Sequence, residues 1–437
     1  MKFEYKIKNL ALINEANIKI APFTLIAGKN NTGKSFVTKS LYCILEALND
    51  DYVYSKLFKL LNLIKDEFYI FSSQVDKPAK IDIEFFEYFE KDFLVNLEYL
   101  VKKIKQDERI NINSFSSEVE KIKLYYNRRK NIKKFSNIII HIEKIISILD
   151  GIISILNEPE RVIIREIDKN LNINFKKNFI ITSLNELLDN KKNSKLSLKI
   201  ENIGEVIISD NKIGFSFFRD GVEKIQKLSN VIYIDSPVYT KLKKVLKREY
   251  LFDENYLKNY PLYIDKFYDF LEKRYIGEAE FKKLSIKIQK IIKGKLEIDS
   301  FKNINYISKN GLFPIYLTAM GITNIGIIDM LIRNNVINKG SFLIIDEPEV
   351  HLHPEWQVEF VKILYEIAKA GANVVITTHS MDIVKTVEVL AKEDKENIAI
   401  NKMPFSKDFN EKNTQEKISE ILEELGSPFY ELYFEGL

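Results

Sequence analysis

Cysteine is almost absent from this 437-residue chain, in which Cys43 is the only example. A single thiol excludes a disulfide framework and a cysteine-based zinc site, and it favours a reducing, cytoplasmic location. Long apolar runs are absent as well. No stretch reaches about 18 uninterrupted apolar residues, and the opening MKFEYKIKNL lacks the apolar segment of a signal peptide. We therefore expect neither a transmembrane helix nor a membrane partner.

Net charge and glycine are also scarce. The 66 Lys and Arg residues nearly balance the 62 Asp and Glu residues and leave +4, which by itself indicates neither nucleic-acid nor membrane binding. Hydrophobic residues make up 46% of the chain, so a sizeable core is expected and global disorder is excluded. The 15 glycines are about half of the usual ~7% share, so a cluster of them is informative.

Strand and helix patterns alternate at both ends of the chain. Residues 3–27 contain strand-like segments, and a helical pattern follows the glycine-bearing loop after them. From residue 303 onward, INYI, LFPIYL, SFLIIDEP, NVVITTHS and NIAIN read as strands, with helices near 320–335 and 355–370. This alternation predicts a largely parallel sheet with right-handed crossovers.

The middle of the chain has a different pattern. Residues 51–180 have almost no Gly or Pro and predict several long helices, of which 138–156 is the most apolar and is expected to be buried or paired. Residues 195–220 and 230–237 return to strands, and 238–300 predict helices. The sequence thus predicts five regions, namely 1–50, a helical insertion 51–194, a β part 195–237, a helical lid or insertion 238–302, and 303–437.

The first glycine cluster carries the clearest chemistry. GKNNTGKS matches the P-loop pattern GxxxxGK(S/T), in which backbone N–H groups surround a phosphate, a lysine reaches the β- and γ-phosphates, and a hydroxyl coordinates Mg²⁺. The helix that follows adds the positive end of its dipole. The competing interpretation is a chance glycine-rich turn. The residues assigned to nucleotide binding are Gly28, Lys29, Asn30, Asn31, Thr32, Gly33, Lys34, Ser35 and Phe36.

Two apolar strands near the other end finish in polar residues. SFLIIDE ends in Asp346 and Glu347, the Walker B pattern, in which strand alternation puts Asp346 in the Mg²⁺ shell with Ser35 and Glu347 beside the attacking water. NVVITTH ends in His379, which could hydrogen-bond a γ-phosphate. Lys34, Glu347 and His379 are therefore the candidate catalytic residues. The competing interpretations are an acidic strand-to-helix turn and a helix-capping loop at Ser380.

The order of P-loop, long insertion, DEPEVHLHPEWQ and TTHS resembles the ABC-type ATPases of the SMC/RecF/OLD (overcoming lysogenisation defect) group, over roughly 1–50 and 195–400. The resemblance implies an α/β fold: an ABC-type P-loop ATPase with a mixed or parallel sheet, an antiparallel β subdomain and a large helical insertion. It also implies ATP and Mg²⁺ as cofactors, and a homodimer or higher homo-oligomer with composite ATP sites.

That family uses an LSxG-like signature motif, for which the turn from Thr318 to Gly321 is the best candidate. Thr318 keeps a hydroxyl, whereas Met320 departs from the usual small residue, and an ordinary helix N-cap at Thr318 is the alternative. No Q-loop glutamine can be placed. His351 and His353 are interpreted as D-loop residues at a dimer seam rather than as metal ligands, and Trp356 as a core or interface residue.

Basic runs occur at 121–134, 241–248 and 282–295, either as solvated helix faces or as a phosphate-backbone surface. OLD nucleases carry a Toprim domain after the ATPase, and Glu435-Gly436 superficially resembles its start. The residues after Ser380 are too few for that domain, so nuclease activity in this chain is not expected.

Three functions compete. The first is an OLD-like ATPase whose nucleotide-driven dimerisation controls a separate effector protein, of nuclease or Toprim type, in anti-phage defence. The second is an SMC/RecF-like DNA-binding ATPase in DNA repair, with DNA as its partner. The third is a nucleotide-binding scaffold with negligible turnover. A transporter ATPase is disfavoured by the helical insertion and the HLHP element.

Overall fold

The computed structural model describes residues 1–76, 78–105, 112–136, 138–188, 195–218, 228–242 and 260–434. The chain forms two compact units: Met1–Asn49 together with Asp168–Leu437, and Asp50–Ile167. None of the helices in the described ranges is long and apolar enough to cross a membrane. Glu435-Gly436 and positions 243–248 of the second basic run lie outside these ranges.

A five-stranded parallel sheet forms the centre of the first unit. Its strands are β13 (Ile398–Lys402), β3 (Phe23–Ala27), β12 (Asn373–Thr378), β11 (Phe342–Asp346) and β7 (Val231–Ile234), in that spatial order. Every residue of β3, β7, β11 and β12 is buried. Continuous apolar strands are typical of a sheet covered on both faces, and the parallel sheet expected from the alternating pattern is confirmed.

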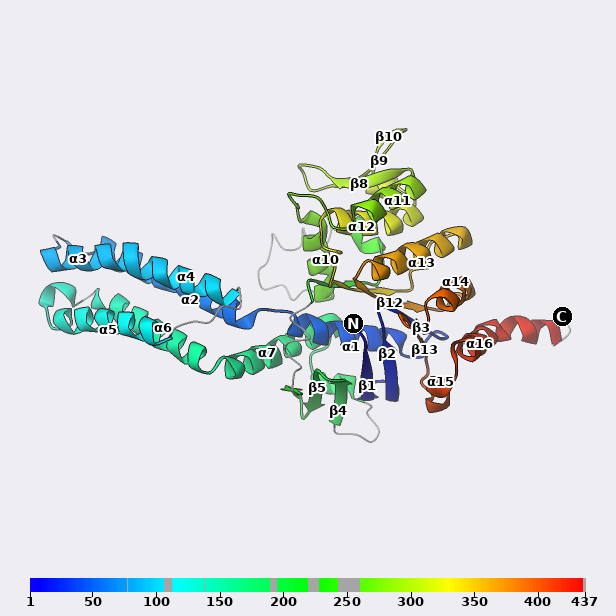
Figure 1. Ribbon diagram of the computed structural model, residues 1–437, viewed down its shortest axis with the longest axis horizontal. Coiled ribbons are helices and arrows are strands. Elements are labelled where there is room, and N and C mark those ends of the chain that lie inside the picture. The colour runs from blue at the N-terminus through cyan, green and yellow to red at the C-terminus, as the bar shows by residue number, and fades with distance from the viewer. Residues whose placement is uncertain are drawn as a thin grey trace. The chain divides into compact units, whose positions relative to one another are not determined.

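The first unit also contains helices, several of which pack on this sheet (Figure 1). They are α1 (Lys34–Leu48), α10 (Leu262–Glu272), α11 (Lys282–Ile292), α12 (Met320–Arg333), α13 (Pro354–Lys369), α14 (Met381–Glu393), α15 (Lys407–Glu411) and α16 (Thr414–Phe434). Helix α1 packs against β7, β11 and β12 and is buried along most of its length. The P-loop is therefore joined to a helix with little freedom to move.

Two antiparallel sheets belong to the same unit. One has the order β2-β1-β4-β5-β6, and the other β10-β9-β8. Their bounds are β1 (Phe3–Leu10), β2 (Ile13–Ile20), β4 (Lys195–Ile200), β5 (Gly204–Ser209), β6 (Lys212–Phe217), β8 (Gly294–Ile298), β9 (Ile304–Ser308) and β10 (Gly311–Pro314). A 3₁₀ turn lies at Leu184–Leu187. These sheets supply the antiparallel β part of the expected α/β fold.

The structure corrects two local predictions. The region 238–300, expected to be helical, ends in β8, where a side chain at Gly294 would place its Cβ 2.4 Å from the carbonyl oxygen of Ile307. Glycine is thus needed for β8 to pair with β9. LFPIYL is not one strand, because β10 ends at Pro314 and a 3₁₀ turn, Ile315–Leu317, follows. Proline has no N–H to continue the ladder.

The second unit consists of helices, as its sequence predicts. They are α2 (Tyr52–Ser73), α3 (Lys80–Tyr88), a π-helical segment (Phe89–Phe93), α4 (Leu94–Lys105), α5 (Ile112–Arg129), a 3₁₀ turn (Lys133–Phe135), α6 (Ile139–Asn157) and the first part of α7 (Pro159–Phe179). Helix α2 packs on α4 and α6, and α5 packs on α6. The buried face of α6 repeats every three or four residues, which confirms a buried helix at 138–156.

A buried ion pair lies within the aromatic core of this helical unit. The Asp82 carboxylate is almost fully buried, lies 2.7 Å from the Arg129 guanidinium, and accepts a hydrogen bond from the Tyr125 hydroxyl at 3.0 Å. It also accepts the Ala79 backbone N–H at 2.8 Å, which closes the first turn of α3. One carboxylate therefore connects the start of α3 with the end of α5.

Asp82→Ala should lower the free energy of unfolding of the helical unit by roughly 3–5 kcal/mol, because it leaves the Arg129 charge buried without its partner. Urea unfolding of the full chain, with hydrogen exchange to locate the loss to α3 and α5, measures this effect. Glu158→Ala is the matched control, since its bridge to Arg161 is exposed and such bridges contribute about 0–1 kcal/mol. Equal effects of the two changes would contradict the prediction.

Candidate functional site

The three sequence motifs meet at one edge of the parallel sheet. The P-loop follows β3, Asp346 ends β11, and His379 follows β12. In the sheet register Ala27 pairs with Thr378, and Thr377 pairs with Asp346. Because the carboxyl ends of neighbouring parallel strands share an edge, the P-loop lies beside the other two motifs although more than 300 residues of sequence separate it from them. Ligands of open α/β sheets bind outside this edge.

Two glycines of the P-loop occupy positions that other residues would disturb. A Cβ at Gly28 would lie 2.1 Å from the backbone oxygen of Met403, which follows β13. Gly33 has φ 95° and precedes α1 as its N-cap, and a Cβ there would lie 2.9 Å from the Ile13 side chain. The loop backbone is therefore packed closely against β13, β2 and α1. Glycine fits at both positions because it has no Cβ atom.

Lys34 lies inside the loop. Its ammonium donates to the carbonyl oxygens of Gly28 and Lys29, both at 2.8 Å, and the residue is 5% exposed. Burial lowers the pKa of Lys34, while the carboxylates of Glu347, Glu349 and Asp346 oppose that shift. The N–H groups in the first turn of α1 point toward the same loop. A cation and a helix N-terminus thus converge on one small region, which suits an anion.

The other P-loop residues differ in exposure. Ser35, Lys29, Asn30 and Asn31 are exposed, and the Thr32 hydroxyl donates to the Lys29 carbonyl at 2.8 Å. Lys29 itself donates to the Ser427 hydroxyl of α16 at 3.1 Å. The half-buried Phe36 ring stacks on Phe179 with centroids 5.8 Å apart, so its side chain packs within the protein.

Asp346 is buried and accepts hydrogen bonds from three hydroxyl groups. It accepts hydrogen bonds from Thr38 at 2.9 Å and Thr377 at 3.1 Å on one oxygen, and from Tyr233 at 2.5 Å on the other. Hydroxyl donors orient a carboxylate without cancelling its charge. The Ser35 hydroxyl and the Asp346 carboxylate are oxygen donors of the kind Mg²⁺ prefers, and Mg²⁺ is bound by one or two such groups together with substrate phosphates.

Glu347 and His379 face each other outside the strands. Because β11 ends at Asp346, the position of Glu347 comes from a left-handed turn, with φ 49°, rather than from strand alternation. Its N–H bonds the carbonyl and the hydroxyl of Thr377. Its carboxylate lies 3.5 Å from His379 Nδ1, and both side chains are more than one-third exposed. Ser380 is the N-cap of α14, as the helix-capping interpretation predicted.

The signature turn lies at the start of α12. Thr318 is buried, its hydroxyl donates to the Pro314 carbonyl at 3.2 Å, and its own carbonyl accepts from the Lys241 ammonium at 3.0 Å. The N-cap of α12 is Ala319, so the predicted alternative of a cap at Thr318 is wrong. A Cβ at Gly321 would lie 3.3 Å from Leu352 and 3.4 Å from Trp356. The signature turn therefore packs on the HLHP segment of the same chain.

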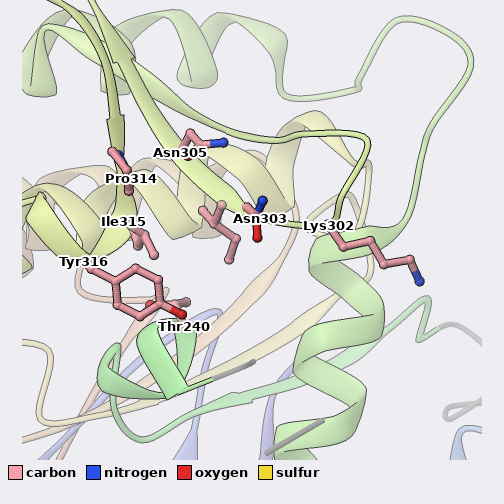
Figure 2. A pocket seen from close by; sticks show the side chains of 8 residues that line it. Thr240, Lys302, Asn303, Asn305, Pro314, Ile315 and Tyr316 are labelled. Carbon is pink, nitrogen blue, oxygen red and sulfur yellow. The ribbon is translucent and has the colours of Figure 1, made fainter. Parts of the chain in front are cut away.

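A pocket of about 230 Å³ lies beside this turn. It is lined by Thr240, Lys302, Asn303, Ile304, Asn305, Pro314, Ile315 and Tyr316. Figure 2 shows the Tyr316 ring next to Thr240, with the Lys302 side chain pointing away from both. Because Thr240 is followed by Lys241, which bonds the Thr318 carbonyl, the pocket borders the segment that supports the signature turn.

The two histidines of the HLHP segment lie in different local environments. His353 is the N-cap of α13 and accepts the Glu355 N–H at 3.4 Å, and His351 is exposed with φ 65°. Within the described ranges, no three His, Cys, Asp or Glu side chains form a group that could hold a metal ion. Trp356 is half-buried against the signature turn.

Many members of the basic runs are engaged within the protein. Lys123 bridges Asp150 at 3.0 Å and Glu120 at 3.2 Å, and Arg129 pairs with the buried Asp82. In the third run, the Lys282 ammonium lies 3.0 Å from Glu278, and Lys287 pairs with Glu366. Acids therefore neutralise part of both runs, which favours their interpretation as charged helix faces.

Four residues of the site were missed by sequence reasoning: Thr38, Tyr233, Asp235 and Glu349. Asp235 follows β7 at the same sheet edge and accepts a hydrogen bond from the Tyr263 hydroxyl, and burial raises its pKa. An acid directly after an apolar strand was the signal used for Asp346, and YIDSP carries the same signal. Thr38 and Tyr233 give no such signal, because they lie within a helix and a strand.

Comparison with known proteins supplies the family. A family model described as AAA ATPase domain matches residues 1–384. No curated protein matches the chain. Among solved structures, the SMC head domain from Thermotoga maritima shares 9% identity, with 88% of this chain and 92% of that chain covered and a TM-score of 0.36. A dimeric bacterial ABC transporter cassette shares 10% identity, with coverage of 91% and 94% and a TM-score of 0.29.

The family match spans most of the chain and includes the P-loop, the Walker B strand and His379. The parallel sheet, the P-loop between β3 and α1, and the motifs at its carboxyl edge agree with that assignment. The chain therefore belongs to the AAA ATPase domain family and has a P-loop ATPase fold.

Proposed function

We propose that the chain binds ATP with Mg²⁺ at the carboxyl edge of the parallel sheet and hydrolyses it to ADP and phosphate. The observation that carries this proposal is the convergence of Lys34, Asp346, Glu347 and His379 at one edge. Lys34 and the N-terminus of α1 attract the phosphates, Ser35 and Asp346 hold Mg²⁺, and Glu347 accepts the proton of the attacking water. Mg²⁺ bound by these residues would neutralise negative charge on the nucleotide phosphates.

Lys34→Ala should weaken ATP binding by about 10- to 100-fold or more, because a charged hydrogen-bond donor to phosphate is lost. Equilibrium dialysis with ATP measures the affinity directly. Lys362→Ala is the matched control, since Lys362 lies on α13 and pairs with Glu359 at 2.9 Å on the surface. Unchanged ATP affinity in the Lys34 variant would contradict the assignment of residues 28–35 as a P-loop.

Glu347→Gln should keep ATP affinity and slow turnover by about 10²- to 10⁴-fold, because an amide cannot take the proton of the attacking water. Phosphate release under saturating ATP gives the rate, and dialysis gives the affinity. Glu359→Gln removes the same charge from the surface of α13 and should leave the rate unchanged. A parental rate in the Glu347 variant would show that another group is the base.

We further propose that each working ATP site is shared between two copies of the chain. One copy contributes Lys34, Asp346, Glu347 and His379, and the other contributes the turn Thr318–Gly321 with the N-terminus of α12. Support comes from the packing of the signature turn on Leu352 and Trp356, which joins the two segments expected at a dimer seam. The helix N–H groups suit a γ-phosphate, and ADP lacks that phosphate, so ATP favours the closed dimer.

Mixing two inactive variants tests the shared site. Gly321 is a poor position for this test, because a side chain there also presses on Leu352 and Trp356. Ala319 is exposed and is the N-cap of α12, and an acidic N-cap stabilises a helix. Ala319→Asp should therefore fold normally and repel the γ-phosphate of the opposite copy, whereas Ala319→Asn, its uncharged isostere, should keep activity.

Lys34→Ala and Ala319→Asp chains should each have little ATPase activity alone. When they are mixed, each mixed dimer should contain one intact site, built from Lys34 of one chain and Ala319 of the other, so activity should return in part. Mass measurement reports whether mixed dimers form, and phosphate release reports their ATPase activity. Mixed dimers without recovered activity would contradict the shared site.

At the level of biology, we propose an OLD-like, cytoplasmic role in which nucleotide-driven dimerisation controls a separate nuclease or Toprim effector in anti-phage defence. The alternative is an SMC/RecF-like DNA-binding ATPase in DNA repair, and the internal pairing of the basic runs gives it no added support. A neighbouring gene for a nuclease would favour the first role. Salt-sensitive, ATP-dependent DNA binding would favour the second. The five-region division of the chain stays a prediction.

A further inference from the structure

Glu349 is a buried carboxylate that the nucleotide chemistry described above does not use. It lies in the turn after β11, and its side chain is 6% exposed. One oxygen, Oε1, accepts the Thr378 hydroxyl at 2.7 Å and the His379 backbone N–H at 2.9 Å. The other oxygen, Oε2, is buried and has no hydrogen-bond partner within the described part of the chain. Burying a charge in this way is costly, so its contacts require an explanation.

The contacts of Glu349 concentrate on the loop that carries His379. Besides the backbone N–H, Oε1 lies 3.4 Å from His379 Nδ1, and Glu347 Oε1 lies 3.5 Å from the same nitrogen. A bare nitrogen lone pair facing two carboxylate oxygens would be repelled. Nδ1 of the ring therefore carries a proton. In an imidazole, the group that faces one ring nitrogen decides whether that nitrogen is protonated.

The two ring nitrogens of an imidazole point to different sides, so Nε2 is directed away from the two carboxylates. The His379 side chain is 41% exposed, whereas Glu349 is enclosed beneath it. The next residue is also fixed, because the Ser380 hydroxyl donates to Gln357 of α13 at 2.7 Å and its N–H donates to Thr378 at 2.9 Å. The loop is thus held on both sides of His379, and Nδ1 of the ring lies beside the two acids.

We propose that Glu349 is a positioning residue for His379: it fixes the loop Thr378–Ser380 and faces the Nδ1–H side of the ring, so that, when the ring carries a proton on each nitrogen, Nε2–H donates to the terminal phosphate of a nucleoside triphosphate. This inference rests on the proposed ATP site. Glu349 thereby makes the site sensitive to the γ-phosphate. Its loss should affect ligands that carry this phosphate and spare ADP.

The experiment compares the affinities of the full chain for a non-hydrolysable ATP analogue and for ADP. Glu349→Ala should lower the preference for the triphosphate about tenfold or more and leave ADP affinity within about twofold, because one charge-assisted contact to phosphate is lost. His379→Ala should have the same effect, and the double variant should add little, since coupled residues are non-additive. Glu355→Ala, in the first turn of α13, is the control and should change neither affinity.

A merely structural role predicts a different result, in which triphosphate and ADP affinities fall together, and that result would overturn the proposal. An unchanged preference in Glu349→Ala would overturn it too. If the alanine variant does not fold, Glu349→Gln is measured instead. Its amide oxygen still accepts from Thr378 and His379 but attracts the Nδ1 proton less, so the preference should also fall. Failure of the ATP site itself is distinguishable, because the parental chain would then bind neither nucleotide.

Nitrogen NMR of ¹⁵N-histidine-labelled protein gives a readout that needs no ligand. The chain has four histidines, and the signals of His379 are assigned by their loss in His379→Gln. In the parental chain, Nδ1 of His379 should be protonated, and in Glu349→Ala the proton should redistribute between the two nitrogens. A parental ring already protonated on Nε2 alone would contradict the proposed role of Glu349.

Discussion

The parallel alignment of β3, β12 and β11 is the constraint on which the candidate site depends, because each of its reactive side chains follows one of these strands. The register pairs Ala27 with Thr378 and Thr377 with Asp346. The P-loop, the Walker B acid and His379 must therefore lie at one edge. A shift of one residue in the pairing of β11 with β12 would turn Asp346 away from Thr377 and would move His379 away from Glu347.

The acids at this edge are stabilised in different ways, and each way suits a different task. Asp346 is buried but is held by three hydroxyls, which orient its carboxylate. Glu349 is buried against a hydroxyl and a backbone N–H and lies beside a ring nitrogen of His379. Glu347 is one-third exposed in a left-handed turn. These three environments suit the roles proposed above, namely metal binding by Asp346, positioning of His379 by Glu349, and acceptance of a proton from water by Glu347.

The helical unit has a core and a buried ion pair of its own, and none of the candidate site residues belongs to it. The site therefore needs only the first unit for its geometry. Within that unit, Gly321 packs on Leu352 and Trp356 and so joins the signature turn to the HLHP segment. A change in one of these segments is expected to displace the other. The two segments therefore belong to one surface.

The sequence alone determined the parallel sheet, the P-loop, Asp346, Glu347 and His379, because these features depend on local patterns: an apolar strand followed by glycines, acids or a histidine. Strand β8 was not predicted, because the close approach of Gly294 to Ile307 arises only when β8 pairs with β9. Tyr233 and Thr38 were also missed, because their partner Asp346 lies 113 and 308 residues away. The tertiary structure decided these contacts, since sheet order and burial bring such residues together and no local pattern encodes that proximity.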